Sequence, residues 1–295
     1  MSSPEGRRRR RPEYRLACLT SGRRRSVEKF VNVFVQIAIL AVLLATVGGN
    51  VVAAAPPSAE SQRESGLQKK PALAEYSWIH GSSDCAANSD PALDIYAADP
   101  TTYILRQNKC TTYEAPFIYV LIGESKVLVL DTGAIEDDAD SQLYDAVDTI
   151  LAAVPMEGRE ILVIHSHGHR DHYNGDAQFT DKPSVTLVET RRDDVVSFFG
   201  FTEWPSGEAT IDLGGRVLTV IPTPGHQEEA ITVYDQKTGW LLTGDTLYPG
   251  YIYVKNWQDY KNSIARLAQF AESNEVVGIF GTHIEMTTDA GRYYP

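Results

Sequence analysis

A dense group of histidines is the first feature of this sequence that could do chemistry. Within eight residues the chain places four imidazoles and a carboxylate, namely His165, His167, His169, Asp171 and His172. Neutral imidazole nitrogens and carboxylate oxygens are the usual protein ligands of Zn²⁺. Polar groups packed this closely beside an apolar run, residues 161–164, need partners. The cluster therefore predicts a metal site. Because one ion cannot easily take four ligands from so tight a loop, we expect two ions.

Three further candidate ligands lie farther along the chain. They are His226, Asp245 and His283, in the motifs Pro-Gly-His, Gly-Asp and Gly-Thr-His. Each follows a run that predicts a strand; these runs cover residues 216–221, 240–243 and 276–280. Catalytic pockets are commonly assembled from several strand ends on a rigid scaffold. We therefore expect these side chains to converge with the first cluster.

From residue 76 onward the chain alternates between strand-like and helix-like runs. The predicted strands cover residues 117–122, 126–130, 161–164, 185–188, 216–221, 230–234, 240–243 and 276–280. The predicted helices cover 138–154 and 256–273, where apolar residues recur at helical spacing. Because strands and helices interleave and the strands fall in two halves, we expect two packed sheets with helices outside.

The order of these motifs resembles that of the metallo-β-lactamase superfamily. His-x-His-x-Asp-His at 167–172 is followed by a Gly-His turn, a Gly-Asp pair and a final His, and residues 128–133 resemble the family's first motif. The resemblance runs from about residue 115 to residue 285. It implies an α/β (α+β) fold, a four-layer αββα sandwich with the metals at one edge of the sheets.

The resemblance also implies roles for individual residues. The first metal ion would be held by His167, His169 and His226. The second would be held by Asp171, His172 and His283. Asp245 would bridge the two ions, and Asp131 would orient ligands through hydrogen bonds. His165 lies outside the ligand pattern, and the ligand count favours a structural or outer role for it.

Two zinc ions are the expected cofactors, and iron or manganese stay open because these metals share ligand types. A metal pair ~3.5–4 Å apart can share a hydroxide formed at neutral pH, which would attack a carbonyl. Asp171 is placed to orient that nucleophile. Tyr248 resembles the tyrosine of quorum-quenching lactonases whose hydroxyl contacts a substrate oxygen. Simple packing is an equally good interpretation of Tyr248.

We therefore expect an exported dinuclear hydrolase that cleaves an ester, lactone, thioester or related carbonyl bond of a small molecule. Asp245 stands where dedicated β-lactamases have a Cys or no bridging ligand. Two alternatives stay open: a weak or specialised β-lactamase, and a non-catalytic or iron-binding redox member of the fold. The sequence departs from the family pattern at Asn174-Gly175, where Gly-Gly is common, and at residues 227–229, where Gln-Glu-Glu replaces a Thr or Ser.

Four aromatic residues lie close together between two predicted elements: Phe198, Phe199, Phe201 and Trp204. One interpretation is a lid that closes on an apolar acyl group. The other, which we favour, is a loop that packs back on the core.

The N-terminal 55 residues have the composition of a targeting segment. A basic head, with Arg7–Arg11 and Arg23–Arg25, precedes the apolar run 31–47 and three alanines at 53–55. These are the parts of a signal peptide, although residues 30–55 are also long enough for an uncleaved membrane anchor. We expect residues 56–75 to be a linker and 76–295 the hydrolase domain. Either interpretation predicts a periplasmic or secreted body, with membrane attachment as an open possibility.

Cysteines and charge agree with this organisation. Cys85 and Cys110 are the two cysteines of the body, and in an oxidising compartment we expect them to form a disulfide; two free thiols are the alternative. The whole chain has a net charge of −12, although residues 1–55 carry ten Lys or Arg and three Glu. The body is therefore strongly acidic, which disfavours nucleic acid as a partner.

Overall fold

The computed structural model of the chain describes residues 72–79, 81–136, 142–155 and 160–285. All described residues belong to one compact unit, residues 69–295. The predicted targeting segment 1–55 and the linker up to residue 71 lie outside the described ranges. Within those ranges, no helix combines the length and the apolar character needed to cross a bilayer.

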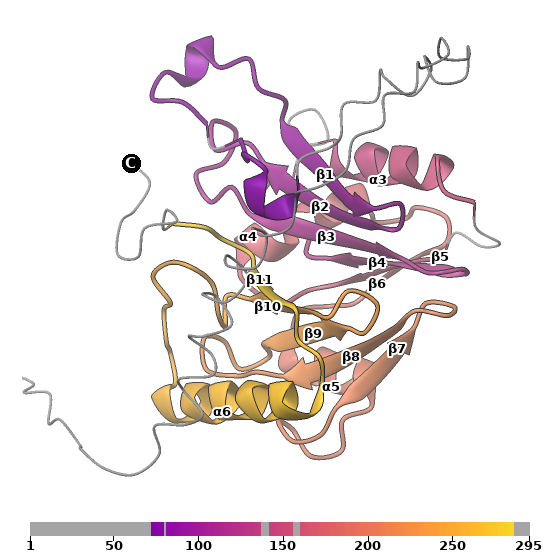
Figure 1. The fold of residues 1–295 in the computed structure, drawn as a ribbon, viewed down its shortest axis with the longest axis vertical. Helices are drawn as coiled ribbons and strands as arrows, with labels where there is room; N and C mark the ends of the chain where they lie inside the picture. Colours follow the sequence, from indigo (N-terminus) through magenta and orange to yellow (C-terminus); the bar gives the residue numbers. More distant parts are fainter. Residues whose placement is uncertain (1–71, 80, 137–141, 156–159, 286–295) are drawn as a thin grey trace, which may run out of the picture. The chain divides into compact units, whose positions relative to one another are not determined.

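Two sheets form the centre of the domain (Figure 1). The first has the order β1-β2-β3-β4-β5-β6, antiparallel up to β4 and parallel from β4 to β6. Its strands are Leu93–Asp99, Thr102–Gln107, Phe117–Ile122, Lys126–Leu130, Glu160–Ile164 and Val185–Leu187.

The second sheet has the order β11-β10-β9-β8-β7, in which only the β10–β11 pair is parallel. Its strands β7 to β11 are Ala209–Asp212, Val217–Pro222, Ile231–Asp235, Trp240–Gly244 and Gly278–Gly281.

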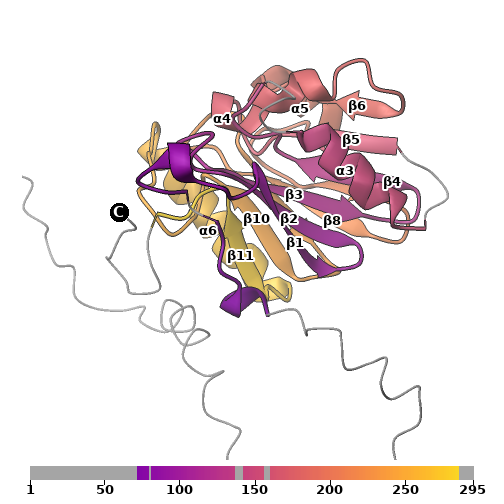
Figure 2. The same cartoon turned by 90° about the horizontal axis from the view of Figure 1, so that it is seen from above.

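Helices cover the outer face of each sheet. Helix α3 (Leu143–Ala152) lies across the first sheet (Figure 2), and α6 (Trp257–Ser273) covers the second. The buried stripe of α3 packs on the outward-facing residues of β3, among them Ile118 and Val120, whereas Tyr119 and Leu121 face the other sheet. This alternation follows from the period of two along a strand. The expected four-layer αββα sandwich is confirmed.

The shorter helical segments lie in the connections. They are η3 (Leu73–Glu75), η4 (Cys85–Ala87), α4 (Arg170–Tyr173), η5 (Asn174–Gln178) and α5 (Arg192–Phe199). Leu73, from the range expected to be linker, packs against the core between the sheets. The expected disulfide is present between Cys85 and Cys110.

Several elements differ from the sequence-based expectations. The structure adds β1, β2, β7 and α5. Edge strand β1 alternates buried and exposed residues and so has no continuous apolar run, and α5 buries only Val195. The predicted helix 138–154 corresponds to α3, and its residues 138–141 lie outside the described ranges. The final strand, predicted at 276–280, covers Gly278–Gly281 instead, since the Val277 amide donates to Gly239 O, 2.7 Å away, outside the strand ladder.

A buried ion pair lies where β8 begins and β9 ends, and it also contacts the first sheet. Arg216 and Asp235 form a two-pronged contact, with Nε–Oδ1 and Nη2–Oδ2 distances of 3.1 and 2.6 Å. The same guanidinium donates to the Thr101 and Ile122 carbonyls of the first sheet, at 2.6 and 3.2 Å. Arg216, expected to begin a strand, therefore links the two halves of the sandwich.

Candidate metal centre

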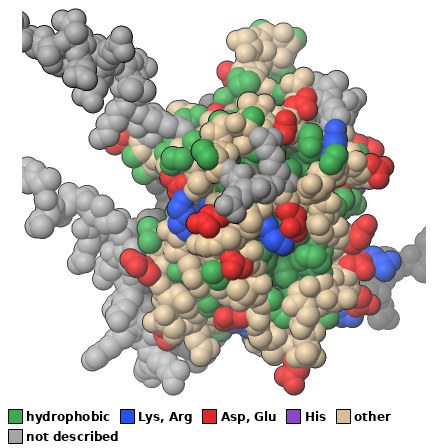
Figure 3. All heavy atoms as spheres, turned by 90° about the vertical axis from the view of Figure 1, so that its right-hand side faces the viewer, with side chains coloured by type: hydrophobic (Ala, Val, Ile, Leu, Met, Phe, Trp, Pro, Cys, Tyr) green, Lys and Arg blue, Asp and Glu red, His purple; other side chains and the backbone are tan. Residues whose placement is uncertain are grey.

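All the predicted ligands lie at one edge of the sandwich, where strands end. The cluster at 167–172 follows β5 and runs into α4. His226, Asp245 and His283 follow β8, β10 and β11. On the right-hand side of the domain, viewed in Figure 3, acidic and basic side chains are interspersed and no histidine is visible. The candidate ligands lie together at the edge of the sandwich that carries α4.

Three imidazole nitrogens form the first group of candidate ligand atoms. His169 Nδ1 lies 3.0 Å from His167 Nε2 and 3.1 Å from His226 Nε2. Asp245 Oδ2 lies 4.0 Å from the His167 nitrogen and 3.7 Å from the His226 nitrogen. The four atoms lie within 4.8 Å of one another. Three imidazoles and a carboxylate are a complete ligand set for a tetrahedral metal ion.

A second group lies on the other side of the Asp245 carboxylate. Asp171 Oδ2 is 3.1 Å from His283 Nε2 and 3.5 Å from His172 Nε2. Asp245 Oδ1 lies 3.6 Å from the His172 nitrogen and 3.5 Å from the His283 nitrogen. The two oxygens of Asp245 therefore face different groups, which is the arrangement of a bridging carboxylate.

Two buried atoms test whether this site fits metal ions. Among the described residues, His172 Nε2 and Asp245 Oδ1 are the buried side-chain polar atoms without a hydrogen-bond partner. Leaving such atoms unpaired costs about 1–3 kcal/mol each. Both atoms belong to the second group, where a cation would satisfy them. The donor set and these unpaired atoms fit two metal ions.

Hydrogen bonds on the outer side of the imidazoles fix which nitrogen is free. His226 Nδ1 donates to Tyr253 O at 2.6 Å, and His283 Nδ1 donates to Glu114 O at 3.1 Å. A carbonyl oxygen can only accept, so the proton sits on Nδ1 and the Nε2 lone pair faces the centre. His169 is reversed: its Nδ1 faces the centre and its Nε2 contacts the side-chain amide of Gln227.

Asp131 holds the ends of three strands together behind the ligands. Its carboxylate accepts from the Ser166 amide at 2.7 Å, the Ser166 hydroxyl at 2.9 Å and His172 Nδ1 at 2.8 Å. The Thr282 hydroxyl lies 3.3 Å away. The structure thus places Asp131 where it orients His172, and its φ of 67° is tolerated because Asp adopts the left-handed region more readily than most residues.

His165 belongs to neither ligand group. Its Nδ1 lies 3.1 Å from Val188 O, and its Nε2 lies 2.9 Å from Asp176 Oδ1. The same Asp176 oxygen accepts from the Thr132 hydroxyl at 2.8 Å. Both ring nitrogens have partners, so the structure places His165 in a buried link behind the site.

The surroundings of Asp171 and Asp245 keep both carboxyl groups ionised. Burial alone would raise the pKa of Asp171, but its contacts with the His172 and His283 imidazoles hold it well below its usual range. Asp245 is buried too, and its contact with His172 likewise lowers its pKa. Both carboxyl groups are therefore ionised at neutral pH, the state in which they bind metals.

The imidazoles divide into two kinds. Burial is the main cause that lowers the pKa of His167, and the charges of His172 and His226 lower it further. Burial and the charge of His226 likewise lower the pKa of His169. His172 is also buried, yet the Asp131 charge raises its pKa, and Asp171 does the same for His283. The second group therefore concentrates negative charge, for which a metal ion competes with protons.

The two departures from the family pattern have structural consequences. Glu229 Oε1 accepts from the Gly168 amide at 2.8 Å, inside the ligand loop, and a Cβ on Gly168 would lie 2.8 Å from the same oxygen. A Cβ at Gly175 would collide with Thr132 O. Close packing therefore requires a glycine at position 175. Position 174 has no such requirement, and the Asn174 side-chain amide donates to Ala134 O at 2.9 Å.

Tyr248 and three of the four aromatic residues at 198–204 are packed, whereas Phe198 is 45% exposed. The Tyr248 ring lies 5.7 Å from the His283 ring, and its hydroxyl donates to Tyr251 O. Phe199, Phe201 and Trp204 pack against the core between the sheets, and Trp204 Nε1 donates to Glu228 O at 3.1 Å. These contacts favour the packing interpretation of both features.

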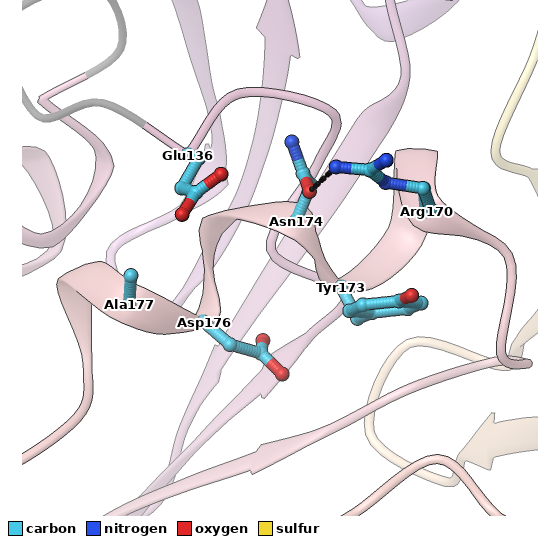
Figure 4. A pocket seen from close by; sticks show the side chains of 6 residues that line it. All are labelled: Glu136, Arg170, Tyr173, Asn174, Asp176 and Ala177. Atoms are coloured by element: carbon cyan, nitrogen blue, oxygen red, sulfur yellow. Dashed lines mark hydrogen bonds between the residues drawn. The ribbon is translucent and has the colours of Figure 1, made fainter.

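A pocket of about 360 Å³ lies on α4, η5 and the segment that contains Glu136 (Figure 4). Its lining residues are Glu136, Arg170, Tyr173, Asn174, Asp176 and Ala177. None of them is a predicted ligand, and Arg170 Nη2 donates to Asn174 Oδ1 at 3.3 Å. Sequence reasoning missed this pocket and also the carbonyls of Glu114 and Tyr253, because a backbone acceptor has no residue-type signal.

Comparison with known proteins agrees with the geometry. A family model of the metallo-beta-lactamase superfamily matches residues 112–278. That range is more than half of the chain, and the chain therefore belongs to this superfamily, as its motifs predicted.

Individual relatives are hydrolases by name. The chain is 28% identical over 150 residues to a hydroxyacylglutathione hydrolase of Synechococcus sp. (strain JA-2-3B'a(2-13)), covering 49% of this chain and 57% of the relative. It is 32% identical over 208 residues to the acyl-coenzyme A thioesterase MBLAC2 of Gallus gallus, covering 57% of this chain and 72% of the relative. A solved metallo-beta-lactamase from Pontibacter korlensis aligns with a TM-score of 0.49 and 19% identity, over 65% of this chain and 91% of that chain. The chain thus spans less than two thirds of the Synechococcus relative.

Proposed function

We propose that this protein is a dinuclear metal-dependent hydrolase that cleaves a carboxylic ester or thioester. The observation that carries the proposal is the division of the Asp245 oxygens between two ligand groups, with Oδ2 facing His226 and Oδ1 facing His283. The names of the relatives support the bond type, since one is a hydroxyacylglutathione hydrolase and another an acyl-coenzyme A thioesterase.

Two groups of side chains would hold the ions. His167, His169 and His226 would hold one, Asp171, His172 and His283 the other, and Asp245 both. When bound, two Zn²⁺ ions supply positive charge that polarises a carbonyl and acidifies water at neutral pH. Iron and manganese accept overlapping ligands, so the metal is a part of the proposal that elemental analysis decides.

Asp171 is the residue best placed to orient the attacking water molecule. Its side chain is 20% exposed, against 10% for Asp245, so it is the ligand carboxylate that water and substrate reach more easily. Its low pKa keeps it ionised, and an ionised carboxylate accepts a hydrogen bond from a water molecule and orients it. Tyr248 would stay neutral, because burial and then Asp245 raise its pKa well above the usual range. We assign it to holding the loop at Tyr251 rather than to proton transfer.

The geometry supports the two alternatives, a β-lactamase and an iron-binding redox protein, less well than it supports an esterase or thioesterase. A bridging Asp245 differs from the Cys expected in dedicated β-lactamases, and it leaves a complete dinuclear set for hydrolysis. A redox role would require bound iron, and a purified protein that is colourless and contains zinc would exclude it.

A substrate panel tests the proposal. The purified chain, native and metal-stripped, would be assayed with an aryl ester, a thioester, a lactone, a phosphodiester and a chromogenic β-lactam. We expect ester or thioester turnover that is lost on stripping and restored by Zn²⁺. Turnover of only the β-lactam or the phosphodiester, or turnover that survives stripping, would contradict the proposal.

We also propose that the body is exported and acts on a small molecule. The Cys85–Cys110 disulfide supports an oxidising compartment, and the acidic body argues against nucleic acid as a partner. Cell fractionation with N-terminal sequencing tests this. A cytosolic protein with an intact basic N-terminus would contradict it, whereas a membrane-bound one would indicate the anchor.

A further inference from the structure

The turn that follows His226 contacts the loop of the other ligands through two side chains. Gln227 and Glu229 are both partly buried. Glu229 Oε1 accepts from the Gly168 amide at 2.8 Å, and the side-chain amide of Gln227 contacts His169 Nε2. Both residues belong to the segment 227–229, where the sequence departs from the family pattern. The family motif therefore does not account for these contacts.

Gln227 also contacts a lysine on the loop before α6. Lys255 Nζ donates to Gln227 Oε1 at 3.2 Å. The Lys255 and Asn256 amides donate to Gly225 O, at 2.9 and 2.8 Å. The Gly225 amide in turn donates to Gln227 O at 3.1 Å, so the backbones of the turn and the loop are joined. The amide group of Gln227 therefore lies between two partners, His169 and Lys255.

The orientation of the Gln227 amide group depends on which nitrogen of His169 carries the proton. In the structure the amide nitrogen faces His169 Nε2, and the amide oxygen accepts from Lys255. An amide nitrogen can only donate, so this orientation requires a lone pair on His169 Nε2 and a proton on Nδ1.

A metal ion on His169 Nδ1 requires the opposite tautomer. The proton then lies on Nε2, and this N–H group needs an acceptor. A half-turn of the Gln227 amide group supplies the acceptor, because it brings the amide oxygen to His169. The same half-turn directs the amide nitrogen at Lys255 Nζ. Since both of these groups are donors, the Lys255–Gln227 hydrogen bond is lost.

We propose that Gln227 is a positioning residue for the first metal ion and that Lys255 competes with His169 for its amide oxygen. The Lys255–Gln227 hydrogen bond and the metal-binding tautomer of His169 therefore exclude each other. Because Lys255 is exposed, its ammonium group can move into water, so the competition lowers the metal affinity without blocking the site. The inference rests on the metal centre of the proposed function, but not on the reaction.

Metal affinity measures the positioning role of Gln227. The Zn²⁺ affinity of the full chain would be determined by competition with a chelating dye, and the binding constant that His169→Ala abolishes belongs to the first ion. We expect Gln227→Met to lower this affinity about 10- to 100-fold, because the imidazole loses its outer partner. Gln227→Glu keeps an oxygen acceptor, so its affinity should equal or exceed that of the wild type. Gln258→Met is the matched control, because it removes only an exposed contact with Asn262 on α6.

Lys255 tests the competition. Lys255→Met should raise the affinity of the wild type for the first ion about two- to tenfold, because no hydrogen bond then opposes the half-turn. Loss of a positive charge by itself also favours a cation. Lys261→Met, at an exposed position on α6, measures that contribution. In the Gln227→Met background, Lys255→Met should change the affinity no more than Lys261→Met does, since no amide oxygen is left to compete for.

The outcomes separate this inference from the proposed function. Equal affinities of Gln227→Met and the wild type would overturn the positioning role, and equal effects of Lys255→Met in both backgrounds would overturn the competition. Either result leaves the hydrolase standing if turnover depends on the metal. Affinities in the expected order without any ester or thioester turnover would support this inference and overturn the proposed hydrolysis. A wild type that binds no metal ion would overturn both.

Discussion

At the scale of single residues, the centre depends on which atoms of each side chain face inward. The sequence identifies ligand types and their order, but only the structure shows that His169 uses Nδ1 whereas His226 uses Nε2. The backbone acceptors that fix these choices, at Tyr253 and Glu114, belong to loops whose path depends on tertiary packing. The sequence therefore predicts which residues are candidate ligands, but it does not predict which ring nitrogen of each histidine faces the centre.

Asp131 provides a test at this scale. Asp131→Asn would place an amide donor against donors from Ser166 and His172, which disorients His172. We expect metal affinity to fall about 10- to 100-fold, measured by competition with a chelating dye. The matched control is Asp212→Asn, because the Asp212 carboxylate is exposed and accepts from the nearby Gly214 amide, away from the ligands. Equal affinity of the Asp131 variant and the wild type would show that the hydrogen bond has no orienting role.

At the scale of elements, the strands that carry ligands were predictable because each combines an apolar run with a glycine and a polar residue at its end. Strands β1 and β2 were not, since they carry no ligand motif and β1 is an edge strand with a mixed pattern. Arg216 shows the limit of pattern reading. An arginine at the start of a strand predicts exposure, yet this one is 3% exposed because Asp235 and the carbonyls of the other sheet neutralise it.

The Arg216–Asp235 pair gives a prediction about stability. Arg216→Met leaves the Asp235 carboxylate buried without its cation, and we expect the free energy of unfolding to fall by about 3–5 kcal/mol. Lys126→Met is the control, because the Lys126–Glu160 pair is 39% and 48% exposed and such pairs contribute under about 1 kcal/mol. Urea unfolding measures both. Similar losses in the two variants would contradict the role assigned to the buried pair.

At the scale of the whole molecule, a contact between loops of the two sheets links stability to pH. Asp99, at the end of β1, accepts from the Thr101 amide at 2.7 Å and from Lys237 Nζ, in the turn between β9 and β10, at 3.0 Å. Burial alone would raise the pKa of Asp99, but these hydrogen bonds lower it to about 2. The folded state therefore binds this proton less tightly than an unfolded chain, where the pKa is about 3.9.

The sign of this difference predicts an effect of pH. The stability that Asp99 contributes is fully present above about pH 4 and is lost as the pH falls towards 2. Asp99→Asn should therefore be less stable than the wild type at pH 7, and the gap should narrow between pH 4 and pH 2. Thermal unfolding across that range measures it. A gap that stays constant with pH would mean that the carboxylate charge is not responsible.

The central claim is that two metal ions lie on either side of the Asp245 carboxylate, and anomalous diffraction from crystals grown with Zn²⁺ tests it most directly. The account predicts two peaks, one next to His167, His169 and His226 and the other next to Asp171, His172 and His283. Asp245→Ala should weaken both peaks, because its two oxygens face both groups. A single peak, or peaks away from these residues, would contradict the dinuclear centre.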